Sequence, residues 1–158
     1  MIIDIVRENE IVNRIIEDIK SNGHTILEYK KVGVRSGQKV VYFININSNQ
    51  YVLKIVNVTP NIAIEGALEK EDNNQIINEE VERLSKRTVK EIKMGKECDN
   101  LPQLRILDDF KIIEINSMYY LYYIEEKIEG ESLEYKKEYT FFEIIDFIYQ
   151  MVEGIIKM

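Results

Sequence analysis

The spacing of apolar residues changes along the chain, and these changes limit the folds that it can adopt. From Ile26 to Val58 apolar residues alternate with polar ones, with turn-forming breaks at Ser36-Gly37 and at 47–49. This alternation predicts three antiparallel strands, at about 26–34, 39–46 and 51–58. Two further strands, at about 105–115 and 119–128, meet at Asn116-Ser117. The pattern predicts an α+β fold with a five-stranded antiparallel sheet.

Segments with helical spacing surround these strands. Before Ile26, apolar residues recur near helical spacing up to a turn at 21–23, which predicts an amphipathic helix. This helix either packs across the sheet or docks on a partner domain. A long helix at about 76–98 crosses between the third and fourth strands, and a short helix is expected at 64–68. A last amphipathic helix follows Thr140, a residue type suited to capping.

Composition argues against several classes of protein. Hydrophobic residues make up 45% of the chain, enough for a core, whereas a formal charge of −7 argues against binding to nucleic acid. Cys98 is the sole cysteine, so neither an internal disulfide nor a cysteine-based zinc cluster can form within the chain. The sequence has no signal peptide and no membrane-spanning apolar run, which predicts a cytoplasmic protein. His24, the sole histidine, is expected at the surface.

Two charged residues interrupt apolar faces. Lys54 shares a strand face with Val52 and Val56, and Glu91 falls within a stripe of the long helix. A buried charge needs a partner, so an ion pair between Lys54 and Glu91 would satisfy both residues. The alternative is that Lys54 lies on an edge strand and Glu91 on the edge of its stripe, both facing water. The stripe consists of Ile77, Val81, Leu84, Thr88, Glu91, Gly95 and Cys98.

These residues resemble motifs of protein kinases. Tyr51-Val52-Leu53-Lys54 is similar to the third-strand motif whose lysine holds the α- and β-phosphates of ATP. Lys90-Glu91-Ile92, followed by Asn100-Leu101-Pro102, resembles the crossing helix whose glutamate pairs with that lysine. Residues 126–133 resemble the hinge that binds adenine, and residues 142–158 the helix before the catalytic loop. The resemblance implies the ATP-binding small lobe of a bacterial-type serine/threonine kinase or kinase-like phosphotransferase.

The resemblance also implies boundaries and residue roles. It divides the chain into an N-terminal helix at 1–23, a kinase-like small lobe at 24–128, and a hinge exit with the first helix of an incomplete large lobe at 129–158. Since it begins near Ile26, removing the residues before Ile26 is expected to spare the sheet. Lys54 and Glu91 would be the catalytic positions. The residues implied to bind the nucleotide are Gly33, Gly37, Val41, Val52, Lys54, Glu126 and Ile128.

Several features depart from the kinase pattern. The first hairpin lacks the usual glycine spacing, so either Arg35 or Lys39 supplies charge to a phosphate, or the hairpin holds no phosphate. Glu125 falls at the gatekeeper position, which is usually apolar or small. The His-Arg-Asp and Asp-Phe-Gly motifs are not present, and Asp109-Phe110 is a false match. The chain alone is therefore expected to be inactive, with magnesium for ATP supplied mainly through a large lobe in cis or in trans.

Two other interpretations stay open. The chain is compatible with a non-catalytic, kinase-lobe-like binding protein that regulates or completes a kinase-like partner. It is also compatible with an unrelated α+β domain in which Lys54 and Glu91 are surface charges. Under the kinase interpretation, a protein substrate or a regulator would be a further partner.

Overall fold

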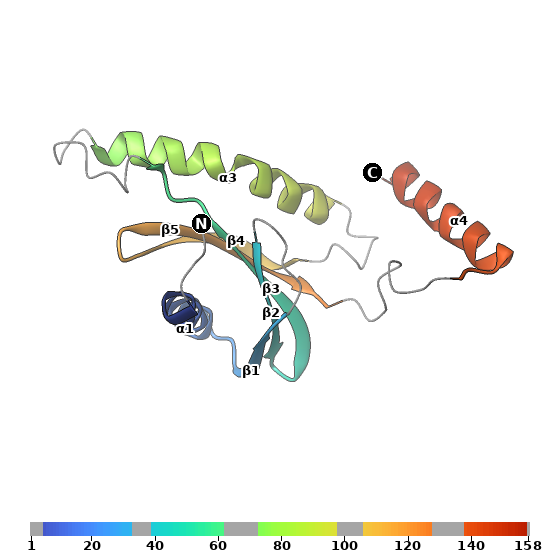
Figure 1. Cartoon of the computed structure of the whole chain (residues 1–158), viewed down its shortest axis with the longest axis horizontal. Helices are drawn as coiled ribbons and strands as arrows, with labels where there is room; N and C mark the ends of the chain where they lie inside the picture. Colours follow the sequence, from blue (N-terminus) through green and yellow to red (C-terminus); the bar gives the residue numbers. More distant parts are fainter. Residues whose placement is uncertain (1–4, 33–38, 62–72, 98–105, 128–137, 158) are drawn as a thin grey trace.

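The computed structural model describes residues 5–32, 39–61, 73–97, 106–127 and 138–157 (Figure 1). Helices α1 and α3 lie on opposite faces of a sheet, and α4 lies apart from it (Figure 1). The elements in chain order are α1 Ile5–Ser21, β1 Ile26–Lys31, β2 Lys39–Ile46, β3 Asn49–Asn57, α3 Asn73–Glu97, β4 Ile106–Ile115, β5 Met118–Glu126 and α4 Phe141–Lys157. The expected α+β class with five strands is thereby confirmed.

The five strands form one antiparallel sheet in the order β1-β2-β3-β5-β4. Strand β3 is central, and its Lys54 lies opposite Val41 of β2 and Tyr123 of β5. Two-residue turns close the β2–β3 and β4–β5 hairpins, with φ of 50° and 69° at Asn47 and Ser48. Asn116 and Ser117 have φ of 52° and 58°. Positive φ at both central residues is typical of type I′ turns, which suit the twist of the strands, so both predicted turns are confirmed.

Helix α1 packs across one face of the sheet and forms the larger of two hydrophobic clusters with it. Ile15 is fully buried, and so is Leu53 of β3 in the same cluster. The other α1 residues in this cluster are Ile11, Val12, Ile16 and Ile19. The first of the two roles expected for this helix is therefore the one observed. Helix α1 supplies five of the fifteen buried residues of this cluster, so it belongs to the core, and this counts against the expectation that the sheet is independent of the residues before Ile26.

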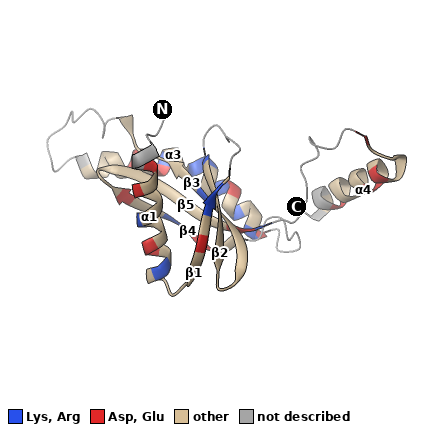
Figure 2. Ribbon diagram, turned by 60° about the horizontal axis from the view of Figure 1, so that its bottom comes forward, with Lys and Arg blue, Asp and Glu red and all other residues tan. Residues whose placement is uncertain are grey.

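Polar contacts hold α1 in place at both ends. Glu8 lies 2.6 Å from the Lys31 ammonium and accepts a hydrogen bond of 2.5 Å from the Tyr42 hydroxyl. At the other end, Asp18 accepts hydrogen bonds from the Tyr122 hydroxyl and from Lys111. Both acidic and basic residues occur along the α1 ribbon (Figure 2). The polar contacts of α1 thus join it to β1, β2, β4 and β5.

Helix α3 covers the opposite face. Val81 and Ile92 pack on Leu121 and Tyr123 of β5 in the second hydrophobic cluster. The buried positions of α3 are Val81, Ser85, Thr88, Ile92 and Gly95. The structure differs from the expected stripe at two positions. Leu84 is 39% exposed, and Ile92 faces the sheet in place of Glu91. Cys98, the last residue of that stripe, lies outside the described residues.

Helix α4 begins with a reciprocal cap, as Thr140 predicted. The backbone N–H of Thr140 donates to Glu143 at 2.8 Å, and the backbone N–H of Glu143 donates to the Thr140 hydroxyl at 3.3 Å. This arrangement is a capping box, which satisfies donors at the first turn. Within the described residues, no helix combines the length and apolar character needed to span a lipid bilayer. The short helix expected at 64–68 lies outside the described residues.

Truncation of Ile15 is expected to destabilise the whole protein, because this side chain is fully buried between α1 and the sheet. The variant Ile15→Ala should lower the free energy of unfolding by about 2–5 kcal/mol, as is usual for a large-to-small change in a core. The exposed Glu17→Ala variant in the same helix should change it by less than about 0.5 kcal/mol. Urea unfolding followed by circular dichroism measures both. Equal stability of the two variants would mean that α1 is not part of the core.

A pH-dependent contribution to stability is expected from Glu8. Burial disfavours its charged form, but hydrogen bonds from Lys31 and Tyr42 and the charge of Lys31 outweigh burial and lower the pKa of Glu8 below its ordinary value of 4.5. A lowered folded-state pKa gives stability that is present above pH 4.5 and is lost as pH falls through the folded pKa.

The variant Glu8→Gln isolates this contribution. At pH 7 it should be less stable than the native protein by about 1–3 kcal/mol, and the difference should shrink as pH falls below 4.5. Urea unfolding across this pH range measures the difference, with the exposed Glu17→Gln as control. A difference that stays constant with pH would rule out a role for the Glu8 charge.

Candidate functional site

The sheet face toward α3 carries charged residues next to apolar ones. In-register neighbours on adjacent strands place their side chains on the same face, where they contact one another. Two rows cross β2, β3 and β5 in this way. The first row is Val41, Lys54 and Tyr123, and the second is Phe43, Val52 and Glu125. These rows bring residues of the β2–β3 hairpin together with residues of β5, which are far apart in the sequence.

Lys54 lies on this face and pairs with Glu125. Its ammonium is 2.5 Å from the Glu125 carboxylate, and the side chains are 24% and 18% exposed. The same ammonium lies 5.8 Å from the centre of the Tyr123 ring. The sequence-based alternation of β3 therefore placed Lys54 on the correct face, but the carboxylate that neutralises it comes from β5 and not from the crossing helix.

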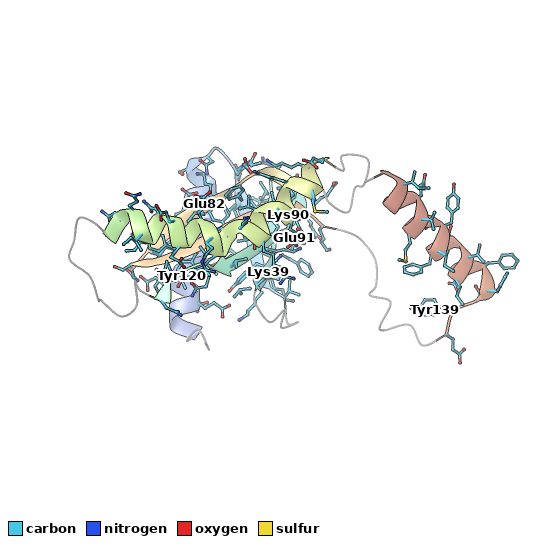
Figure 3. The ribbon with its side chains drawn as sticks, turned by 90° about the horizontal axis from the view of Figure 1, so that it is seen from above. Lys39, Glu82, Lys90, Glu91, Tyr120 and Tyr139 are labelled. Carbon is cyan, nitrogen blue, oxygen red and sulfur yellow. The ribbon has the colours of Figure 1, made fainter. Side chains whose placement is uncertain are left out.

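Glu91 lies at the edge of α3 and pairs with Lys39, the first residue of β2. The Lys39 ammonium is 2.8 Å from each oxygen of Glu91 (Figure 3). It also donates a hydrogen bond of 2.9 Å to the Tyr123 hydroxyl. Lys39 is 19% exposed and Glu91 51% exposed, so this pair is open to solvent on the side of the carboxylate.

Tyr123 stands between the two ion pairs. Burial raises its pKa; the charge of Lys54 opposes this, and the charges of Glu125 and Glu91 add to it. Its hydroxyl therefore stays protonated, and it hydrogen-bonds Glu91 while accepting from Lys39. A neutral tyrosine in this position links the two lysines without adding charge to the cluster.

An apolar patch adjoins the cluster. Phe43, 41% exposed, and Val52 lie next to each other across β2 and β3, and Val41 lies beside Lys54. The Lys127 ammonium lies 5.3 Å from the centre of the Phe43 ring. An exposed aromatic ring beside two valines offers a flat apolar surface, whereas the lysines offer hydrogen-bond donors for an anion.

The structure brings only some of the implied residues together. Val41, Val52 and Lys54 share the face just described, and Glu126 ends β5 opposite Tyr51. The expected contact between Lys54 and Glu91 is replaced by two other pairs, because Glu91 lies at the edge of its helix and reaches the start of β2 instead. Gly33, Gly37 and Ile128 lie outside the described residues.

The structure also places His24 and Asp109, two residues that the sequence analysis singled out. His24, expected at the surface, is only 18% exposed and its imidazole lies 2.5 Å from the Asp108 carboxylate. Asp109 of the false motif lies in β4, where Lys96 binds it at 3.1 Å. The hydrogen bond from Lys96, together with the backbone N–H of Phe110, lowers the pKa of Asp109 below its ordinary value. Both residues therefore hold β4 to neighbouring elements.

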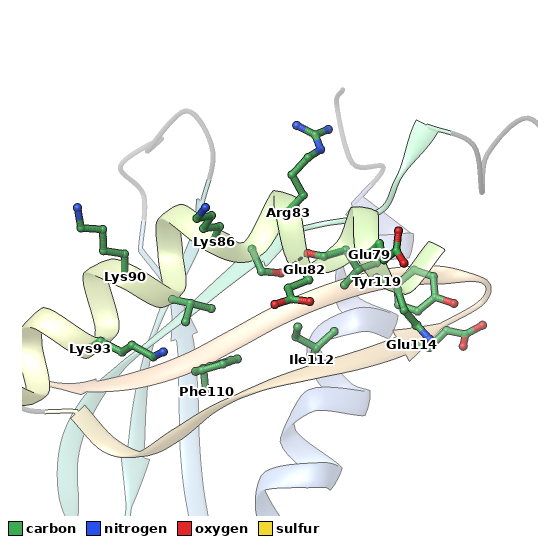
Figure 4. A pocket seen from close by; sticks show the side chains of 14 residues that line it. Glu79, Glu82, Arg83, Lys86, Lys90, Lys93, Phe110, Ile112, Glu114 and Tyr119 are labelled. Atoms are coloured by element: carbon green, nitrogen blue, oxygen red, sulfur yellow. Dashed lines mark hydrogen bonds between the residues drawn. The ribbon is translucent and has the colours of Figure 1, made fainter. Parts of the chain in front are cut away.

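A groove of about 1110 Å³ lies on the other flank of α3, between this helix and β4 (Figure 4). Phe110 and Ile112 of β4 form part of its apolar wall, and Lys93 of α3 lies near Phe110 (Figure 4). Carboxylates line the other end, where Glu114 lies near Tyr119 (Figure 4). None of the implied nucleotide-binding residues that the structure describes lines this groove.

Sequence reasoning offered Lys39 as one of two cations for a phosphate, but it missed the pairing of Lys39 with Glu91 and the positions of Tyr123 and Phe43. The alternation that singles out Lys54 also applies to β2, where Lys39 shares its face with Val41 and Phe43. The sequence therefore contains a signal for the face on which Lys39 and Phe43 lie. It contains no such signal for the position of Tyr123, because that position depends on the register between β3 and β5.

Comparison of the chain with protein-family models, with curated proteins and with solved structures finds no significant match to any of them. Among the described residues, no group of three or more His, Cys, Asp or Glu side chains has a geometry that could hold a metal ion.

Removal of one member of the Lys54–Glu125 pair is expected to be more harmful than removal of both. The variant Glu125→Gln leaves a largely buried ammonium without its counter-ion and should lower the free energy of unfolding by about 1–3 kcal/mol. The double variant Lys54→Met/Glu125→Leu removes both charges and should be closer to the native protein. Chemical unfolding of the single variants and the double variant tests this. Additive losses would mean that the two residues do not interact.

Proposed function

We propose that this chain is the ATP-binding small lobe of a bacterial-type serine/threonine protein kinase or a kinase-like phosphotransferase. The observation that carries the proposal is the apolar patch of Val41, Phe43 and Val52, which lies beside lysines on the sheet face under α3. A nucleotide needs both surfaces, one for its base and one for its phosphates.

The order of the elements supports this proposal. Three strands, a crossing helix and two further strands follow one another along the chain, which is the order of elements expected for the small lobe, and the five strands form the sheet β1-β2-β3-β5-β4. The base would lie on the apolar patch, with the backbone at the end of β5, near Glu126, offering hydrogen bonds to its edge. The ammonium groups would bind phosphate oxygens, and Glu91 would orient a lysine. In this proposal magnesium is held mainly by a large lobe.

Helix α4 supports a large lobe as partner. Its apolar residues are exposed over a wide arc, and a helix that is apolar on most sides is usually buried by neighbouring elements. Exposed fractions above 60% occur at Phe141, Phe142, Tyr149 and Ile156. The polar residues Glu143, Asp146, Gln150 and Glu153 recur at steps of three or four and form a single narrow stripe. We infer that a kinase large lobe, in cis or in trans, covers the apolar arc.

A second function is favoured by Glu125. Its carboxylate neutralises Lys54 and borders the apolar patch, where the negative charge opposes phosphate binding. A kinase-like lobe that acts only by binding a kinase-like partner would tolerate this carboxylate. Such a protein would use α4 for docking and would bind no nucleotide.

Calorimetric titration of ATP with magnesium into the purified chain separates the two functions. Saturable binding is expected for the native protein. The variant Val52→Glu should weaken it by about tenfold or more, because it places a second carboxylate beside Glu125 on the surface for the base. Gln50→Glu is a matched control on the same face of β3, and its affinity should stay within about twofold of the native value.

Circular dichroism melting shows whether each variant is folded, and Val52→Thr replaces Val52→Glu if the latter unfolds. Absence of saturable binding by the native chain would contradict the nucleotide-binding proposal and favour the binding protein. Equal binding by Val52→Glu and Gln50→Glu would place the base elsewhere.

A further inference from the structure

Lys39 and Lys54, the two lysines on the sheet face toward α3, pair with carboxylates in different places. Lys54 pairs with Glu125, which lies directly across from Val52 of the apolar patch. Lys39 is drawn toward α3, where both oxygens of Glu91 lie 2.8 Å from its ammonium. The first pair borders the surface for the base, and the second lies away from it.

Positions along β2 give the order of these surfaces. Phe43, Val41 and Lys39 alternate on one face of the strand, so successive members are about 7 Å apart at the strand rise of roughly 3.3 Å per residue. A nucleotide whose base contacts Phe43 and Val41 would therefore bring its phosphates to Lys39. Lys54 lies directly across from Val41, at the level of the base or the sugar.

The surroundings of Lys39 also suit a lysine that is held for an anion. The Tyr123 hydroxyl accepts from its ammonium at 2.9 Å, and the same ammonium lies 5.5 Å from the centre of the Tyr123 ring. The Glu91 side chain is 51% exposed, compared with 18% for Glu125. The two lysines are similarly exposed, at 19% for Lys39 and 24% for Lys54, so the difference lies in the carboxylates, and Glu91 can move into solvent more easily than Glu125.

We propose that Lys39, and not Lys54, is the residue that binds the phosphates of the nucleotide, and that Glu91 is the positioning residue that orients Lys39. This inference rests on the proposed nucleotide-binding function. It reassigns the phosphate contact from the third strand to the second, and it leaves the Lys54–Glu125 pair as a border of the surface for the base.

Titration of ATP with magnesium and of adenosine into Lys39→Met and Lys54→Met tests the assignment. Lys39→Met should weaken ATP binding by about 10- to 100-fold, the usual effect of losing a charge-assisted contact, and should leave adenosine binding unchanged. Lys54→Met should change ATP and adenosine binding by the same factor. The ratio of the two affinities reports on the phosphates alone, so a general loss of stability does not imitate the expected result.

The role of Glu91 is tested in the same way. Glu91→Gln should lower the ratio of ATP to adenosine affinity in the native background and should have no further effect in the Lys39→Met background. An effect of equal size in both backgrounds would show that Glu91 does not act through Lys39. Lys39→Arg keeps the charge and should retain most of the ATP affinity, which distinguishes the loss of a cation from misfolding.

The outcomes separate this inference from the proposed function. If Lys54→Met lowers the affinity ratio and Lys39→Met does not, the assignment to Lys39 is overturned while nucleotide binding stands. An equal drop in the ratio for both variants would also overturn it, since the two lysines would then share the phosphates. If the native chain binds neither ATP nor adenosine, the proposed function fails and this inference fails with it.

Discussion

The antiparallel pairing of β3 with β5 is the contact on which the rest of the structure depends. Two hairpins with type I′ turns form locally, and this pairing joins them into one sheet through residues 51–57 and 120–126. Strands β3 and β5 are separated in the sequence by α3 and by long connections. Bringing them together therefore costs chain entropy, which the burial of apolar side chains must offset. This pairing buries Leu53 of β3 completely, and it brings Lys54 into contact with Glu125.

The two faces of the sheet have different chemistry because two different helices cover them. Helix α1 makes an aliphatic and aromatic core with one face of the sheet, and its polar contacts lie toward the ends of the helix. Helix α3 packs Val81 and Ile92 on β5, and the side chains of β2 and β3 that lie on this face stay partly exposed. Stability therefore resides mainly in the α1 face, which frees the α3 face to carry charged residues.

Local elements could be predicted from the sequence because their signals are local. Alternation located the strands to within a few residues, Thr140 marked the start of α4, and the Asn-Ser pairs marked both turns. The rotation of α3 was harder, since apolar Ile92 and Leu84 lie close to Glu91 in the sequence and helical spacing alone fits more than one stripe. Ile92 is the residue that the sheet buries, which turns Glu91 to the edge.

The ion-pair partners of charged residues could not be predicted from the sequence, for a related reason. Lys54 needs a counter-ion, but whether it is Glu91 or Glu125 depends on strand register and helix rotation together. A one-residue change in the β3–β5 register would turn Glu125 to the α1 face, where a carboxylate would have no place in an apolar cluster. The hydrophobic pattern of β5 therefore fixes the ion pair indirectly, through Ile124 and Tyr122 on the opposite face.

Charge balance sets a condition on any ligand of the α3 face. Lys39 and Lys54 carry two positive charges and Glu91 and Glu125 two negative ones, so the cluster is neutral and satisfied without a ligand. A phosphate group must compete with carboxylates that already lie within 2.8 Å of the ammonium groups, in a chain of formal charge −7. A polyanion gains little from such a cluster unless a divalent cation accompanies it or a carboxylate moves away. Because Glu91 is the more exposed of the two carboxylates and lies on a helix edge, the Lys39 ammonium can turn toward a phosphate oxygen while it stays beside Glu91, with less loss of buried contact than at Lys54.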